Sequence, residues 1–202
     1  SNLYYIGFEA FSYTAIEKFF IPKHVNHIDN FALTNCENLK IVECAENSEL
    51  KIIGKNVFAE SPIIKISLPS GVSEFCDEWC SLIMQLSEIN VLPTEDKNII
   101  YYEDNYLLLK SDPKSDVYDV LVFANRKIED AVIPSFVKRI ASCAFCYCKC
   151  IETITFPDDS ELAYIDDSAF SSSYVDDITF PASLISIGED AFCECTALKQ
   201  VT

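Results

Sequence analysis

Hydrophobic residues recur along the chain in a fixed phrase rather than in a helical or a simple alternating pattern. Each phrase is an isoleucine, a spacer of about three residues and then Ala-Phe or a close equivalent, as in Ile6–Phe11, Ile53–Phe58 and Ile165–Phe170. Further copies are Ile28–Leu33, the degenerate Phe75–Cys80, Ile140–Phe145 and Ile187–Phe192. A phrase that returns at a regular interval is the sequence signature of a solenoid.

The last residue of each phrase serves as a repeat anchor, and the anchors fall at positions 11, 33, 58, 80, 145, 170 and 192. Their spacings are 22, 25, 22, 65, 25 and 22 residues, so two repeat lengths alternate and one gap is long. After the anchors, apolar residues follow in the order L-x-x-L-x-L, at +5, +8 and +10 or at +6, +9 and +11, and anchor 192 begins the same series with Leu198 and Val201. The final alternation predicts a strand with every second side chain directed inward.

One strand per repeat is therefore expected, and the strands should align as a parallel sheet along the concave side of the solenoid. The eight expected ranges are 16–21, 39–44, 63–68, 86–91, 128–133, 151–156, 175–180 and 198–201. Proline follows the last apolar residue of five repeats, at Pro22, Pro69, Pro134, Pro157 and Pro181. Because proline lacks an N–H, these prolines indicate strand ends. The Ala-Phe anchors should lie inside as an aromatic spine.

The long gap holds one more anchor, Phe123, and a surplus of about 18 residues between roughly residues 93 and 118. The apolar runs Ile99–Tyr102, Tyr106–Leu109 and Val117–Phe123 predict strands separated by turns. We expect a β-hairpin insertion at 93–123 within one repeat domain, 1–202, whose repeats occupy 1–92 and 124–202.

The segments IGKNVFAESPIIKISLPSGV (53–72) and IPSFVKRIASCAFCYCKCIETITFP (133–157) closely resemble the BspA-like class of leucine-rich repeats. The resemblance covers nearly the whole chain, since seven phrases agree in order, spacing and proline placement. Leu33, Trp79 and Cys80 depart from it at Ala-Phe positions. It implies an α/β or mainly β solenoid, a leucine-rich repeat array. BspA-like proteins are commonly surface or secreted adhesins, so it also implies recognition or adhesion at the cell surface.

Composition and charge exclude several other functions. The net charge of -17 repels nucleic acid and anionic membranes and favours a basic protein partner. Only four glycines are present, and no glycine-rich phosphate loop occurs. The sequence has no stretch of 18 consecutive apolar residues, so no segment of it is expected to span a membrane. Residues 1–5 have neither the basic region nor the apolar core of a signal peptide. Since the repeat pattern begins and ends in mid-phrase, we expect the chain to be a fragment of a longer surface protein.

Ten cysteines are present, and three interpretations of them are open. Three lie at position +3 after an anchor, where Thr14, Ser61 and Ser173 replace them in the shorter repeats; these are Cys36, Cys148 and Cys195. This placement predicts a buried ladder of reduced thiols. The run Cys143-x-x-Cys146-x-Cys148-x-Cys150 could instead bind zinc or form disulfides. Cys146 and Cys193 share position +1 and are expected to be exposed.

Catalytic motifs are absent from the sequence. The two histidines, His24 and His27, follow Pro22 and are expected to be solvent-exposed turn residues, with a metal pair as the alternative. No Ser-His-Asp, Cys-His or H-E-x-x-H arrangement can be assembled. We therefore predict a protein that is not an enzyme and that has no cofactor and no metal site.

Acidic residues cluster at outward positions of the later strands. The candidate partner-binding residues of the concave face are Glu88, Glu129, Asp130, Glu152, Asp176 and Asp177. Neighbouring rungs lie about 4.8 Å apart, so these like charges need solvation or a partner. The row is either a solvated acidic face or a docking surface for a basic protein segment or a cation.

Three functions remain in competition. The first is a non-catalytic recognition module at the cell surface or secreted, which adheres to a host or matrix protein. The alternative is an intracellular leucine-rich repeat scaffold in the cytoplasm, because ten cysteines suit a reducing compartment. The third is a metal or redox protein built on the cysteines between Cys143 and Cys150.

Overall fold

The computed structural model describes residues 2–202 as strands, turns and loops, with no helix in that range. The chain divides into two compact units, residues 1–104 and 105–202. The boundary falls inside the segment that was expected to be an insertion, and the assignment of 1–202 to one domain stays a prediction. The described residues include no helix that is long and apolar enough to cross a membrane.

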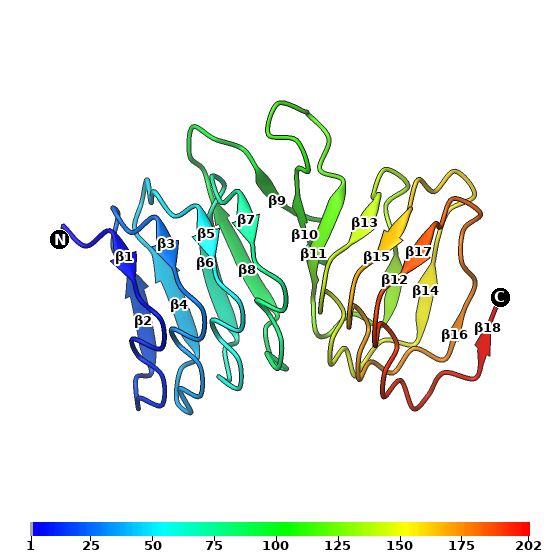
Figure 1. The fold of residues 1–202 in the computed structure, drawn as a ribbon, viewed down its shortest axis with the longest axis horizontal. Coiled ribbons are helices and arrows are strands. Elements are labelled where there is room, and N and C mark those ends of the chain that lie inside the picture. Colours follow the sequence, from blue (N-terminus) through cyan, green and yellow to red (C-terminus); the bar gives the residue numbers. More distant parts are fainter. Residues whose placement is uncertain (1) are drawn as a thin grey trace. The chain divides into compact units, whose positions relative to one another are not determined.

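Two parallel ladders of strands form the first unit (Figure 1). Strands of the L-x-L segments make one ladder in the order β2 (Lys18–Ile21), β4 (Ile41–Cys44), β6 (Lys65–Pro69) and β8 (Glu88–Leu92). Two-residue strands at the start of each phrase make the other, in the order β1 (Tyr5–Ile6), β3 (His27–Ile28), β5 (Ile52–Ile53) and β7 (Glu74–Phe75). Strand β9 (Ile99–Tyr102) follows β8 and contacts it.

The second unit repeats this arrangement after an antiparallel pair (Figure 1). Strand β10 (Tyr106–Leu109) runs antiparallel to β11 (Val120–Ala124) with a bulge between Leu107 and Leu108. Parallel to β11 follow β13 (Arg139–Ile140), β15 (Tyr164–Ile165) and β17 (Ser186–Ile187). The L-x-L ladder consists of β12 (Asp130–Val132), β14 (Thr153–Thr155), β16 (Asp177–Ile178) and β18 (Gln200–Val201).

The eight predicted L-x-L strands are all present, and the repeat solenoid with a hairpin is confirmed. Two details differ from the prediction. A second strand forms in each turn, because the isoleucine at the start of each phrase pairs with its equivalent in the neighbouring turn, as Ile28 does with Ile53. Pro69 is the last residue of β6 rather than the first residue after it, since it pairs in register with Leu92 on the final strand of that ladder.

The anchor side chains fill the interior as predicted. Phe58, Phe123, Phe145 and Phe170 are fully buried, and Phe145 stacks on Phe170 with ring centroids 4.7 Å apart. Phe192 continues this stack at 4.9 Å from Phe170. Aromatic contacts on successive turns add to the free energy gained by burying the rings.

Two residues in left-handed backbone conformation flank each of seven anchors, with φ between 52° and 60°. Two positions before the anchor these are Glu9, Phe31, Asn56, Glu78, Cys143, Ser168 and Asp190; two positions after it they are Tyr13, Asn35, Glu60, Leu82, Tyr147, Ser172 and Glu194. None of them is glycine, although this conformation costs other residues about 1–2 kcal/mol. Hydrogen bonds from these bends to the next turn hold them in place; for example, the N–H of Tyr13 donates to the carbonyl of Thr34 at 3.0 Å.

The position three residues after an anchor carries the predicted ladder of thiols and hydroxyls, except after Cys80 and Phe123, where it is Ile83 and Arg126. Cys36 Sγ donates to the carbonyl of Phe11 in the preceding turn (3.1 Å), Ser61 Oγ to that of Leu33 (2.8 Å) and Cys195 Sγ to that of Phe170 (3.1 Å). All ten cysteines are free thiols. The same bond therefore recurs whether the residue is serine or cysteine.

Arg126 occupies this ladder position after anchor Phe123, and its side chain is buried. Its guanidinium lies 4.4 Å from the Phe123 ring centroid and donates to the carbonyls of Ala144 (2.8 Å) and Cys143 (3.3 Å). It also lies 3.6 Å from the thiol of Cys148. One long side chain thus ties the hairpin strand to the first regular turn of the second unit.

The expectation that Cys146 and Cys193 are both exposed is wrong for Cys146. Cys146 is 2 % exposed, and its thiol donates to the carbonyl of Ser168 in the next turn at 2.9 Å. The left-handed bends direct this +1 side chain toward the following turn, as Thr34 bonds to the carbonyl of Asn56. Cys193 is exposed because no later turn of the described chain covers it.

Gly54 is required by close approach between turns. A Cβ at Gly54 would lie 2.6 Å from the backbone nitrogen of Asn30 in the preceding turn, whose side-chain oxygen accepts the N–H of Lys55 at 2.7 Å. At the same repeat position, a Cβ on Gly7 would meet only the Tyr5 ring, at 3.5 Å.

We predict that Gly54→Ala lowers the free energy of unfolding by about 1–3 kcal/mol, whereas Gly7→Ala changes it little. Urea titration followed by circular dichroism checks both; equal effects would refute the close approach.

The left-handed bends also predict a stabilising substitution. Glu60 is exposed and has a φ of 59°, which is strained for a residue with a Cβ. Glycine removes this strain, and the free energy gained exceeds the cost of the greater chain entropy that glycine has in the unfolded state. We expect Glu60→Gly to raise the free energy of unfolding by about 1 kcal/mol. The matched control Glu37→Gly, an exposed turn residue of the same unit outside the left-handed set, should lower it. Thermal melts of the two variants against the parent measure the difference.

Candidate functional site

Strand register in the second unit brings the predicted acidic residues onto neighbouring rungs. Asp130 on β12 aligns with Thr153 on β14, which aligns with Asp177 on β16. Glu129, Glu152 and Asp176 directly precede these three residues in the sequence. We call Glu129, Asp130, Glu152, Asp176 and Asp177 the acidic strand face.

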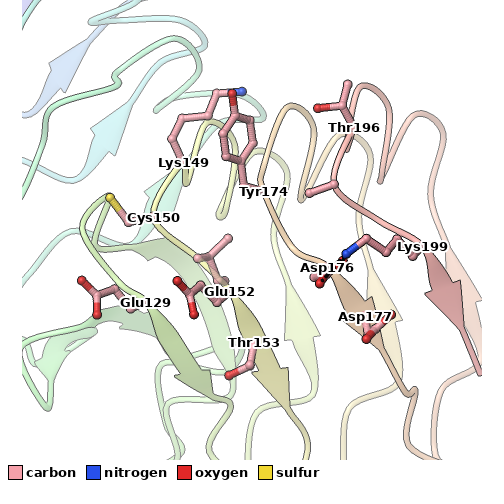
Figure 2. Close-up of a pocket in the computed structure, with 12 residues that line it drawn as sticks. Glu129, Lys149, Cys150, Glu152, Thr153, Tyr174, Asp176, Asp177, Thr196 and Lys199 are labelled. Carbon is pink, nitrogen blue, oxygen red and sulfur yellow. Dashed lines mark hydrogen bonds and ion pairs between the residues drawn. The ribbon is translucent and has the colours of Figure 1, made fainter.

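A hollow of about 850 Å³ lies over this face (Figure 2). Its lining residues come from the starts of β14 and β16 and from the segments that precede β12, β14, β16 and β18. They are Glu129, Lys149, Cys150, Ile151, Glu152, Thr153, Tyr174, Asp176, Asp177, Thr196, Ala197 and Lys199. The lining therefore combines carboxylates, hydroxyls, the aromatic ring of Tyr174 and two lysines, Lys149 and Lys199.

The carboxylates of the hollow differ in their partners. Lys199 forms an ion pair with Asp176 at 2.7 Å, drawn in Figure 2, and this hydrogen bond raises the pKa of Lys199. Within the part of the chain that the structure describes, no ion pair reaches Glu129, Glu152 or Asp177. Lys199 also lies close enough to Asp177 for that charge to contribute to its raised pKa. Three like charges on adjacent rungs that form no ion pair still repel one another, which favours a cationic partner.

One lysine of the hollow contacts an aromatic ring instead of a carboxylate. Lys149 Nζ lies 4.3 Å from the ring centroid of Tyr174 and 5.8 Å from that of Tyr147. Figure 2 shows the Lys149 side chain beside Tyr174 at the edge of the hollow. Tyr174 is 47 % exposed, so its ring is available to a partner.

Glu88, the sixth predicted residue, lies on β8 in the first unit. It aligns with Lys65, and the two form an ion pair at 3.7 Å. The acidic face described above thus contains five of the six candidates, and a role for Glu88 in binding stays a prediction. The partner-binding role of the other five is likewise a prediction that their grouping supports.

Lys149, Tyr174 and Lys199 are site residues that the sequence alone did not identify. Lys149 and Tyr174 both lie four residues after an anchor, so the repeat register places them on adjacent turns. Lys199 lies seven residues after an anchor, as Glu152 does. The signal that identifies these three residues is therefore the repeat register itself, because equivalent turn positions stack as equivalent strand positions do.

The other candidate chemistry is dispersed. His24 Nδ1 lies 3.0 Å from Glu49, and the His27 ring meets Tyr5 edge-on at 5.2 Å. His27 belongs to β3 rather than to a turn. Among residues 2–202, no three His, Cys, Asp or Glu side chains are placed to hold a metal ion.

The thiols of the cysteine run are separated by their surroundings. Cys143, Cys146 and Cys148 are buried, and Cys150 is exposed at the hollow. Burial raises the pKa of the Cys148 thiol, although the nearby Arg126 opposes this shift. Burial also raises the pKa of Cys44 to about 12. A thiol with a raised pKa is a poor nucleophile and a poor metal ligand at neutral pH.

Three solved structures share this fold at low sequence identity. A leucine-rich repeat protein from Eubacterium ventriosum matches with a TM-score of 0.76 and 22% identity, over 98% of this chain and 57% of that one. The pneumococcal vaccine antigen PcpA matches with a TM-score of 0.76 and 19% identity, over 100% and 54%. A leucine-rich repeat protein from Bacteroides ovatus matches with a TM-score of 0.55 and 21% identity, over 98% and 58%. The chain thus spans a little over half the length of each.

None of the curated proteins matches the chain. The model of the BspA type leucine-rich repeat region matches in six copies, over residues 1–104 and 120–202. These ranges include every L-x-L strand and exclude only the loop before β11 and the strand β10. The chain therefore belongs to the BspA-type leucine-rich repeat family.

Proposed function

We propose that this protein is a non-catalytic recognition module that binds a basic segment of another protein through the acidic strand face. The observation that carries the proposal is the stacking of Glu129, Glu152 and Asp177 around one hollow without an ion pair to any described residue. Binding a cationic partner relieves the repulsion between these charges. Leucine-rich repeat arrays generally act as protein-binding scaffolds rather than enzymes, which supports the same role.

We further propose that the module works at the cell surface or as a secreted protein, where it serves adhesion to a host or matrix protein. One structure of the same fold is described as a pneumococcal vaccine antigen, and an antigen of that kind must be accessible to antibodies. The net charge of -17 also keeps an exposed, extended surface soluble.

An intracellular scaffold is the second candidate, and the ten free thiols favour it. Their environment weakens this argument. Six of them are buried and two are half-buried, and burial raises the pKa of Cys44, Cys148 and Cys195. Because the thiolate is the species that oxidises, such thiols survive in an oxidising environment without forming disulfides.

Reversing the charge of the acidic strand face tests the binding proposal. The triple variant Asp130→Lys, Glu152→Lys, Asp177→Lys should weaken binding of a capped octalysine peptide by more than about tenfold, since each lost ion contact contributes roughly 0.2–1 kcal/mol and repulsion replaces it. Isothermal titration calorimetry at 0.15 M salt measures the affinity.

The control triple variant Asp116→Lys, Asp159→Lys, Glu189→Lys changes the net charge equally at exposed acidic positions of the same unit outside the hollow. It should retain most of the affinity, because charges beyond about 8 Å are screened at this salt concentration. Equal losses in the two variants would reduce the effect to net charge and reject the acidic strand face as the site.

Antibody staining of intact source cells tests the proposed location. We expect the signal on unpermeabilised cells to equal the signal after permeabilisation, because a surface protein is already accessible. Staining of a known cytoplasmic protein in the same cells controls for leakage. A signal that requires permeabilisation would establish the intracellular scaffold instead.

A further inference from the structure

The hollow contains a cation-binding surface that is different from its carboxylates, namely the ring of Tyr174. Lys149 Nζ lies over this ring at 4.3 Å from the centroid. The chain's own ammonium group therefore shows that this ring, in its setting beside three carboxylates, attracts a cation. The face of an aromatic ring carries negative electrostatic potential, which is the cause of the attraction.

The second lysine of the hollow, Lys199, neutralises one of its carboxylates. Lys199 binds both oxygens of Asp176, at 2.7 and 2.9 Å. Glu129, Glu152 and Asp177 line the same hollow and have no such partner among the described residues. The hollow thus presents an aromatic ring and carboxylates together. Lysines of the chain contact the ring and Asp176, and the other three carboxylates form no ion pair with the described residues.

We infer that the hollow receives an arginine side chain of the basic partner segment, and that Lys149 competes with this arginine for the Tyr174 ring. The inference rests on the proposed function, because it names the partner group that the acidic strand face binds. Arginine fits this lining better than lysine does. Its planar guanidinium can stack on Tyr174 while its N–H groups bond to a carboxylate such as Glu152 in two-pronged geometry.

Lys149 accordingly acts as a built-in competitor that lowers the affinity for a weakly basic partner. Its side chain is exposed, so it can leave the ring without loss of packing. A partner with several arginines gains enough binding free energy to displace Lys149 from the ring, whereas a single isolated cation does not. This arrangement makes the hollow selective for an arginine-rich segment over scattered surface lysines.

The test measures binding of a capped tetra-arginine peptide, with the capped tetra-citrulline peptide as its neutral counterpart of nearly the same shape. Lys149→Ala should raise the affinity for tetra-arginine by about two- to fivefold, the value of an exposed cation–ring contact. Lys138→Ala is the matched control, since it removes one positive charge from the same unit at an ion pair with Glu161 outside the hollow. It should change the affinity less.

A double-mutant cycle with Tyr174→Leu separates the ring from the charge. In the Tyr174→Leu protein, Lys149→Ala should raise the affinity less than it does in the parent, and Tyr174→Phe should retain the parent behaviour. Thermal melts confirm that each variant is folded.

Equal effects of Lys149→Ala in the two backgrounds, or no tetra-arginine binding by any variant, would overturn the inference. The octalysine result stands apart from it: loss of octalysine binding on charge reversal with no Lys149 effect would retain the acidic strand face and reject only the competition at Tyr174. Binding of tetra-citrulline equal to that of tetra-arginine would also reject it.

Discussion

Backbone hydrogen bonds between successive turns are the constraint on which the rest of this structure depends. The amides of the anchors Phe11, Leu33, Phe145 and Phe170 donate to the carbonyl of the residue before the next anchor, as Phe11 does to Ala32 and Phe170 to Ala191, both at 2.8 Å. A buried N–H without a partner is costly, so every turn must present its carbonyls in register with the turn before it. The two left-handed bends around seven of the anchors satisfy this demand despite their steric strain.

The same constraint explains where the chain departs from its own repeat. Phe123 lies within β11, and no left-handed bends flank it. Ala124, one residue after this anchor, donates its N–H to the carbonyl of Ala144 in the next turn at 2.9 Å. The guanidinium of Arg126, three residues after the anchor, adds donors to the carbonyls of Cys143 and Ala144. A buried charged residue in a hydrophobic array thus bonds the hairpin strand to the next turn.

Register also accounts for the candidate site. Equivalent positions of consecutive repeats are stacked on adjacent rungs, so a charge repeated in sequence becomes a row of charges in space. Repulsion within the row is tolerated because the strand ends face solvent, and Lys199 relieves it at Asp176. The turns at Lys149 and Tyr174 line one hollow together with this row, and the binding that we propose depends on this arrangement.

The sequence by itself determined the repeat, the eight L-x-L strands, the buried anchors and the thiol ladder, because each follows from the spacing of apolar residues. It also located five acidic residues of one face. Only the tertiary structure decided that a second ladder forms at residues such as Ile28 and Ile53, that Cys146 is buried, and that Glu88 pairs with Lys65. These features depend on which turn lies opposite a side chain and how the backbone bends direct it, and neither is encoded in hydrophobic periodicity.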